Sequence, residues 1–204
     1  MARGIRLTPA AAPRIDRSWL FVTAVLMAGA VPAWWLPAAW LDWQPDIAAA
    51  QPWRAWSAAW VHWSPQHLGA NLMAAAVVGA YGWAAQVPRS QALAWCAAWP
   101  LTHAFLLIKP ELAHYGGLSG VLHAGVAIVC LWLLLRARGA RRIVGAAVGL
   151  GLLIKLLSEQ PWGPALQASA EWDISVAPIA HATGALAGLL CGNVALLLTR
   201  KRAA

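Results

Sequence analysis

The stretch HYGGLSGVLHAGVAIVCLWLLLR, residues 114–136, joins two kinds of sequence that rarely occur together. Its second half is an almost unbroken apolar run that ends at an arginine, as expected for a helix that crosses a bilayer. Its first half frames one serine, Ser119, with glycines and places a histidine on either side, at His114 and His123. Polar side chains are costly within a membrane and usually have a role there. An interpretation of the sequence should therefore account for both the membrane helix and the polar residues at its start.

The composition indicates a single-domain, all-α polytopic membrane protein. The chain has 204 residues, of which 61% are hydrophobic and 11% are charged, whereas about 25% of residues are charged in a typical soluble domain. The apolar runs also contain the three cysteines, without CxxC spacing, which favours packing thiols over a disulfide or a metal site. By length and hydropathy we predict six transmembrane helices, over residues 18–38, 67–87, 91–108, 118–135, 142–157 and 180–199.

The charges between these segments predict the topology of the chain. Twelve of the 15 basic residues fall on one side of a six-span chain: Arg3, Arg6, Arg14, Arg17, Arg89, Arg136, Arg138, Arg141, Arg142, Arg200, Lys201 and Arg202. Six of the seven acidic residues fall on the other side: Asp42, Asp46, Glu111, Glu159, Glu171 and Asp173. Basic residues favour the cytoplasmic side of a membrane, so both termini are predicted to be cytoplasmic.

This topology divides the chain into a cytoplasmic N-terminal segment, residues 1–17, a membrane domain, residues 18–199, and a basic cytoplasmic tail, residues 200–204. The basic residues occur in short clusters between apolar runs, so the net charge of +8 indicates membrane topology and not a nucleic-acid partner.

The longest predicted outer loop, residues 39–66, is rich in tryptophan. Trp53, Trp56, Trp60 and Trp63 are spaced three and four residues apart, which places them on one face of a helix. Tryptophan favours the headgroup region of a bilayer. We therefore expect this loop to be membrane-associated, with a helix that lies in the outer interface.

Three of the predicted helices place uncommon polar residues at the same level of the membrane. The second, fourth and sixth segments all run inward from the outer side, and they begin near His67, Ser119 and His181. Asn71 and His123 each follow four residues after the first polar residue of their helix, and so share its face. A histidine is a suitable base for a serine nucleophile near neutral pH. Helix N-termini, with the side chains of His67 and Asn71, provide donors for an oxyanion.

The predicted second to sixth helices contain no acidic residue, which favours a serine–histidine dyad over a triad. Gly184 and Gly188 form a GxxxG motif after His181, a motif that lets two membrane helices approach closely. If the helix that begins at Ser119 is the neighbour, this motif brings His181 to the serine. Three glycines leave space and backbone freedom around the serine: Gly116, Gly117 and Gly120.

These motifs, in this order, resemble those of the rhomboid family of intramembrane serine proteases. The resemblance implies a six-helix rhomboid-like bundle with a water-accessible cavity that is open to the outside, and it implies no cofactor. The matching pieces run from the loop before the second helix to the sixth helix: WRAWSAAWVH at 53–62, HLGAN at 67–71, GGLSG at 116–120 and HATGALAG at 181–188.

The resemblance also implies roles for individual residues. Ser119 would be the nucleophile and His181 the general base. The oxyanion hole would be lined by His67 and Asn71, together with the backbone N–H of Ser119. The Trp53–Arg54 pair would be a structural element of the first loop.

His123 departs from the common rhomboid pattern, which has a tyrosine four residues after the serine. GLSGVLH, with the His114–Tyr115 pair upstream, resembles the rhombosortase subgroup of small bacterial rhomboids. That resemblance implies an inner-membrane enzyme with its active site on the periplasmic side. The substrates would be exported proteins with a C-terminal Gly-Gly motif, a transmembrane helix and a basic tail. His123 would either stack on His181 or hydrogen-bond to it.

Three other functions compete with this interpretation. A general rhomboid protease would cleave other single-span membrane proteins. A non-catalytic rhomboid that binds membrane helices is disfavoured, because Ser119 and His181 are both present. A haem-binding bundle is disfavoured because the six histidines give no matched pair of ligands on facing helices, and the zinc motif HExxH is absent.

Overall fold

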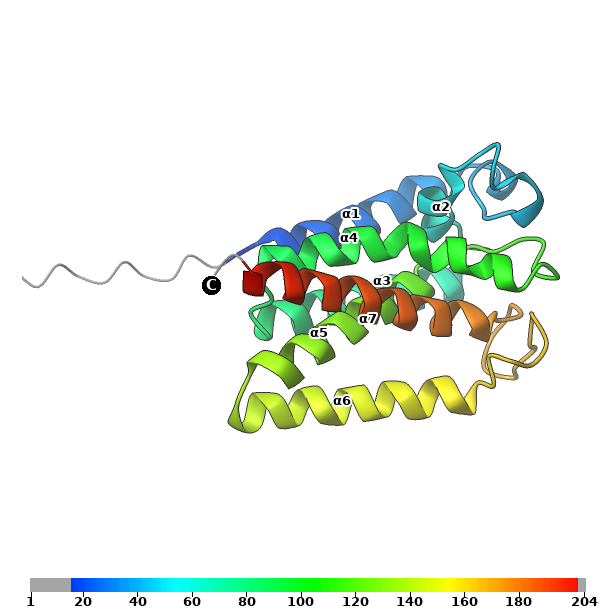
Figure 1. Ribbon diagram of the computed structural model, residues 1–204. Helices are drawn as coiled ribbons and strands as arrows, with labels where there is room; N and C mark the ends of the chain where they lie inside the picture. Colours follow the sequence, from blue (N-terminus) through cyan, green and yellow to red (C-terminus); the bar gives the residue numbers. More distant parts are fainter. Residues whose placement is uncertain (1–15, 202–204) are drawn as a thin grey trace, which may run out of the picture.

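The computed structural model describes residues 16–201, which form α-helices and short 3₁₀ turns joined by loops (Figure 1). Six helices are long: α1 (Ser18–Ala33), α3 (Pro65–Ala84), α4 (Arg89–Ala104), α5 (Ser119–Arg136), α6 (Gly139–Ser158) and α7 (Pro178–Lys201). Each lies within a few residues of one of the predicted apolar segments. The all-helical fold and the place of each long helix are therefore confirmed.

Not every long helix is equally apolar. Segments long and apolar enough to cross a membrane are Arg89–Ile108, Ser119–Arg136 and Pro178–Thr199, while Ser18–Ala33 is apolar but shorter. Helix α6 carries two arginines and a lysine within its 20 residues, and α3 begins with polar side chains. Six membrane crossings therefore remain a prediction.

The arrangement of the helices agrees with an even number of spans. Figure 1 shows that α1 begins and α7 ends at the same end of the bundle, while the loop that joins α6 to α7 lies at the opposite end. The predicted terminal segments 1–17 and 200–204 lie outside the described residues, apart from residues 16–17 and 200–201.

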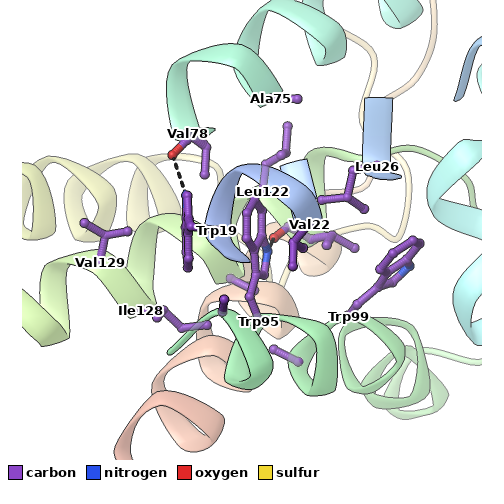
Figure 2. Packing of buried hydrophobic residues seen from close by; sticks show 14 of the residues in the cluster. Trp19, Val22, Leu26, Ala75, Val78, Trp95, Trp99, Leu122, Ile128 and Val129 are labelled. Carbon is purple, nitrogen blue, oxygen red and sulfur yellow. Dashed lines mark hydrogen bonds between the residues drawn. The ribbon is translucent and has the colours of Figure 1, made fainter. Parts of the chain in front are cut away.

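Two buried tryptophans join four helices in the core (Figure 2). Trp19 of α1 stacks on Trp95 of α4, with ring centroids 4.3 Å apart. A buried indole N–H needs an acceptor. The Trp19 indole donates to the carbonyl of Val78 in α3 at 3.1 Å, and the Trp95 indole donates to that of Val121 in α5 at 2.8 Å. These bonds fix the outer part of α5 against its neighbours.

Helices α5 and α7 approach each other at a glycine seam, which consists of Gly120 and Ala124 in α5 and Gly184 and Gly188 in α7. A Cβ atom added to Gly184 would lie 1.9 Å from the carbonyl oxygen of Gly120, and one added to Gly188 would lie 2.3 Å from that of Ala124. The two backbones are therefore in direct contact. The close approach predicted from GxxxG is found, and the neighbour is the helix that begins at Ser119.

Helix α6 is attached much more loosely. It lies at the edge of the bundle and packs mainly on α5 (Figure 1). Gly145 is its one buried residue in the described part of the chain, and a Cβ there would lie 2.6 Å from the Cβ of Leu133. Most of its large apolar side chains face outward.

The tryptophan-rich loop is helical over only a few residues, and its association with the membrane remains a prediction. It contains one α-helical turn, α2 (Arg54–Ser57), which continues into the 3₁₀ turn Ala58–Trp60. Trp53 and Trp56 face outward as expected, but Trp60 points into the bundle. Its indole fills the space where a Cβ of Gly29 in α1 would lie, and it packs edge-on against Trp99 at 5.3 Å.

Arg54 holds the loop together from inside. Its guanidinium lies 3.0 Å from the Asp42 carboxylate, and it also donates to the backbone carbonyls of Asp42 and Ala39 at 2.7 and 2.8 Å. Both side chains are almost fully buried, at 6% and 3% exposure. A buried charge is tolerated when it is paired and hydrogen-bonded. These contacts agree with a structural role for Arg54.

Candidate active site

The loop described above holds the chain just before Ser119. Trp43 and Tyr115 exchange backbone hydrogen bonds of 2.7 and 2.9 Å, and the N–H of Gly117 donates to the carbonyl of Ala58 at 2.9 Å. Helix α5 begins two residues later, at Ser119. The position of the serine therefore depends on a loop more than 50 residues earlier in the sequence.

Gly117 brings the serine segment to the start of α3. Its φ of +129° is rarely adopted by residues with a side chain. A Cβ at this position would lie 2.8 Å from Nε2 of His67 and 3.7 Å from Nδ2 of Asn71. The two residues predicted to line an oxyanion hole thus approach the backbone next to Ser119.

Ser119 and His181 form a hydrogen-bonded pair. Oγ of the serine lies 3.1 Å from Nε2 of the imidazole, within hydrogen-bond distance. The pair joins the first turn of α5 to the first turn of α7, and the glycine seam begins one residue after Ser119 and three residues after His181. Direct backbone contact at that level leaves the two side chains within reach of each other.

His123 stacks on His181, which was one of the two arrangements expected for it. The ring centroids are 4.2 Å apart and the planes differ by 12°. Nδ1–H of His123 donates to the backbone carbonyl of Ser119 at 2.7 Å, one turn earlier in α5. This bond fixes the orientation of the His123 ring, and the stack then restricts the ring of His181.

The sequence interpretation missed Glu159, which directly follows α6. Nδ1–H of His181 donates to Oε2 of Glu159 at 2.7 Å, while Lys155 hydrogen-bonds to Oε1. Burial opposes ionisation of this carboxyl, but the hydrogen bonds and positive charges of His181 and Lys155 prevail and lower its pKa to about 2. The expectation that the histidine has no acidic partner is therefore wrong. No local pattern in the sequence indicates this contact, because it joins residues 22 positions apart across a loop.

A cavity of about 250 Å³ opens onto the serine–histidine pair. The loop that joins α6 to α7 covers it, because Ser64 donates to the Asp173 carboxylate at 2.7 Å and Gln66 donates to the carbonyl of Glu171 at 2.8 Å. The cavity is lined by side chains from four helices and this loop: His67, Asn71, Ser119, Lys155, Glu159, Gln167, Ala168, Ser169, Glu171, Trp172, Ile174, Val176, Pro178 and His181.

A comparison with protein families matches residues 49–197, which is most of the chain, to the Rhomboid domain. The chain belongs to the rhomboid family. Rhomboid proteins are intramembrane serine proteases that act on transmembrane substrates. The matched range includes every residue that lines the cavity. No match is found among curated proteins.

The other three histidines of this rhomboid do not line the cavity, and each hydrogen-bonds to a backbone or loop group. His62 donates to the carbonyl of Trp60 at 3.1 Å, and burial lowers its pKa to about 4. The buried His103 donates to the carbonyl of Ala55 at 2.6 Å, and His114 pairs with the Asp42 carboxylate at 2.6 Å. Each of them therefore ties the first loop to the bundle or to itself.

Proposed function

We propose that this rhomboid is a serine endopeptidase of the bacterial inner membrane, with Ser119 as the nucleophile and His181 as the general base. The observation that carries the proposal is the 3.1 Å hydrogen bond between Oγ of Ser119 and Nε2 of His181. Both groups line the same cavity, so a peptide bond that enters it meets the pair directly.

The reaction follows from this pair. As Oγ of Ser119 attacks the carbonyl carbon of the scissile bond, its proton passes to Nε2 of His181. The tetrahedral intermediate then collapses, and the imidazolium gives that proton to the leaving amine. Water attacks the resulting ester in the second half of the reaction, with His181 again taking a proton. The serine and the histidine are restored at the end.

The oxyanion would be bound by the backbone N–H of Ser119 and the side chains of His67 and Asn71. The N–H groups of the first helical turn have no partner within the helix, and Ser119 is the first residue of α5. The approach of His67 and Asn71 to Gly117 supports their participation. Loss of one such donor typically lowers turnover roughly 10²–10³-fold.

The proposed substrates are the C-terminal sorting tails of exported proteins, which consist of a Gly-Gly motif, a transmembrane helix and a basic segment. His123 supports this subgroup, because a histidine occupies the place where many rhomboids have a tyrosine. The small covered cavity also favours glycines, since they add no side-chain volume next to the cleaved bond. The site lies at the end of the bundle opposite the start of α1 and the end of α7. This end is the periplasmic side if both chain termini are cytoplasmic.

Co-expression with a reporter that carries such a tail tests the proposal. The wild-type protein should shorten the reporter, and the Ser119→Ala variant, expressed to the same level, should leave it intact. Equal processing by both proteins would show that Ser119 is not the nucleophile. A second reporter, with the two glycines replaced by leucines, tests the subgroup. Equal cleavage of both reporters would favour a general rhomboid protease.

A further inference from the structure

The carboxylate of Glu159 continues a line of hydrogen bonds through His181 to the proposed nucleophile. The Glu159 Oε2 to His181 Nδ1 distance is 2.7 Å, and the His181 Nε2 to Ser119 Oγ distance is 3.1 Å. A neutral imidazole has a proton on only one nitrogen. Nε2 accepts from Ser119 only when that proton is on Nδ1, and this is the form that a carboxylate at Nδ1 favours.

Glu159 is itself held in place. Lys155, one turn earlier in α6, pairs with Oε1 and leaves Oε2 for the histidine. The side chain of Glu159 is 25% exposed and that of His181 is 8% exposed, so the bond between them lies at the partly closed wall of the cavity. The carboxylate is ionised at neutral pH, because its pKa is about 2.

His123 and Glu159 restrict His181 in different ways. The stacked ring of His123 limits the tilt of the imidazole plane, and its own Nδ1–H is used by the carbonyl of Ser119. The hydrogen bond to Glu159 instead limits rotation within that plane and selects the tautomer. The titratable and charged groups around the His181–Glu159 pair are Lys155 from α6, His123 from α5 and His67 from α3, and Glu171 of the covering loop lines the same cavity.

We propose that Glu159 is the positioning residue of a Ser119–His181–Glu159 triad. It keeps the proton of neutral His181 on Nδ1, and it stabilises the imidazolium that forms when Nε2 takes the serine proton. This inference rests on the proposed protease function. It adds a contribution from α6 to a site that otherwise depends on α3, α5 and α7.

Steady-state cleavage of a tail peptide by the full-length protein in lipid nanodiscs tests the role. Glu159→Gln should lower kcat about 10²-fold with little change in KM, which is less than the roughly 10⁴-fold loss at a fully buried triad carboxylate. The acid limb of its kcat/KM profile should move to lower pH, because the imidazolium loses its counter-charge. Glu159→Asp should restore part of the rate. Glu111→Gln removes an exposed carboxylate that does not line the cavity and serves as the control.

A measurement on the wild-type protein gives an independent readout that does not depend on the catalytic activity of any variant. With ¹⁵N-labelled histidine, the neutral form of His181, assigned as the signal missing from His181→Gln, should carry its proton on Nδ1. A proton on Nε2 would overturn the proposal.

The variants distinguish a wrong role for Glu159 from a wrong proposed function. If Glu159→Gln keeps the wild-type kcat and pH profile while Ser119→Ala is inactive, Glu159 is not a positioning residue and the protease function stands. If Ser119→Ala also cleaves at the wild-type rate, the proposed function itself is wrong.

Discussion

The α5–α7 interface and the attachment of α6 differ in how closely the helices approach. Across the glycine seam the two backbones are in contact. There is no room between Gly184 and Gly120 for even a Cβ atom. Helix α6 packs on the same α5, yet Gly145 is its one buried residue within the described chain. The proposed nucleophile and base lie on the close interface. Glu159 and Lys155 lie at the end of the loosely packed helix.

This difference separates two requirements of the site. A nucleophile and its base have to stay within hydrogen-bond distance, and direct backbone contact provides this with little freedom to move. A group that orients the base acts through one hydrogen bond, so it can come from a less constrained helix. Changes at the seam should therefore affect activity most, and changes on the outward face of α6 least.

The largest effect is expected from Gly184→Ala. The added Cβ would lie 1.9 Å from the carbonyl oxygen of Gly120, so α7 has to move away from α5. Overpacking of this kind costs about 1–3 kcal/mol, and a displacement of about 1 Å between reacting groups can lower the rate about 10²-fold. Reporter cleavage and the melting temperature in detergent measure both effects.

Gly151→Ala is the matched control on α6, where a Cβ would meet no atom within 4 Å. It should keep full activity and raise stability by up to about 1 kcal/mol, since alanine favours a helix over glycine. Equal behaviour of the two variants would contradict the contrast between the seam and α6.

Gly117→Ala should produce the next largest loss. Its φ of +129° strains any side chain, and the new Cβ would lie 2.8 Å from Nε2 of His67. Gly139→Ala introduces strain alone, because its φ is +57° and no atom lies within 4 Å of its Cβ. Cleavage rates should fall only for Gly117→Ala, whereas both variants should lose stability. A normal rate for Gly117→Ala would argue against a role for His67 in oxyanion binding.

His123 variants should have a moderate effect. His123→Ala removes the ring that stacks on His181 and should lower kcat about 10-fold, as expected for a lost orienting contact. His123→Tyr keeps an aromatic ring at the same position and should recover most of the rate. If the alanine variant matches the wild type, the stack does not orient the base.

The smallest effect concerns acid stability. The pKa of Glu159 is lowered from 4.5 to about 2 in the folded protein, so its contribution to stability is present above pH 4.5 and is lost as the pH falls towards 2. Because the side chain is partly exposed, the contribution is small. The melting temperatures of the wild type and Glu159→Gln should therefore differ slightly at pH 6 and converge near pH 2. A constant difference over this range would indicate another cause.

Local sequence patterns were sufficient for the helices and for the main pair. Apolar runs gave the long helices, and GxxxG at Gly184 and Gly188 correctly indicated the approach that brings His181 to Ser119. The first inference depends only on residues within each helix. The second depends on a local motif that is typical of close helix packing in membranes. The number of membrane crossings does not follow in the same way, because α3 and α6 combine apolar and polar residues.

The errors concern contacts between distant parts of the chain. Glu159 was interpreted only as an outer-loop charge, although the loop that follows it returns the chain to His181, 22 residues later. Trp60 was placed on an outward helical face, but Gly29 in α1 opens a space that its indole fills. Neither contact has a periodic pattern in the sequence, so each depends on the packing of whole helices.

The order of the elements along the chain has a consequence for synthesis. The loop that holds the segment before Ser119 is translated before the serine itself, so this scaffold precedes the group that it supports. His181 follows Ser119 by 62 residues and lies on the last helix. The proposed base is therefore missing until the last span leaves the ribosome. If Ser119 and His181 are the catalytic pair, a nascent chain would be unable to cleave neighbouring proteins before α7 has been synthesised.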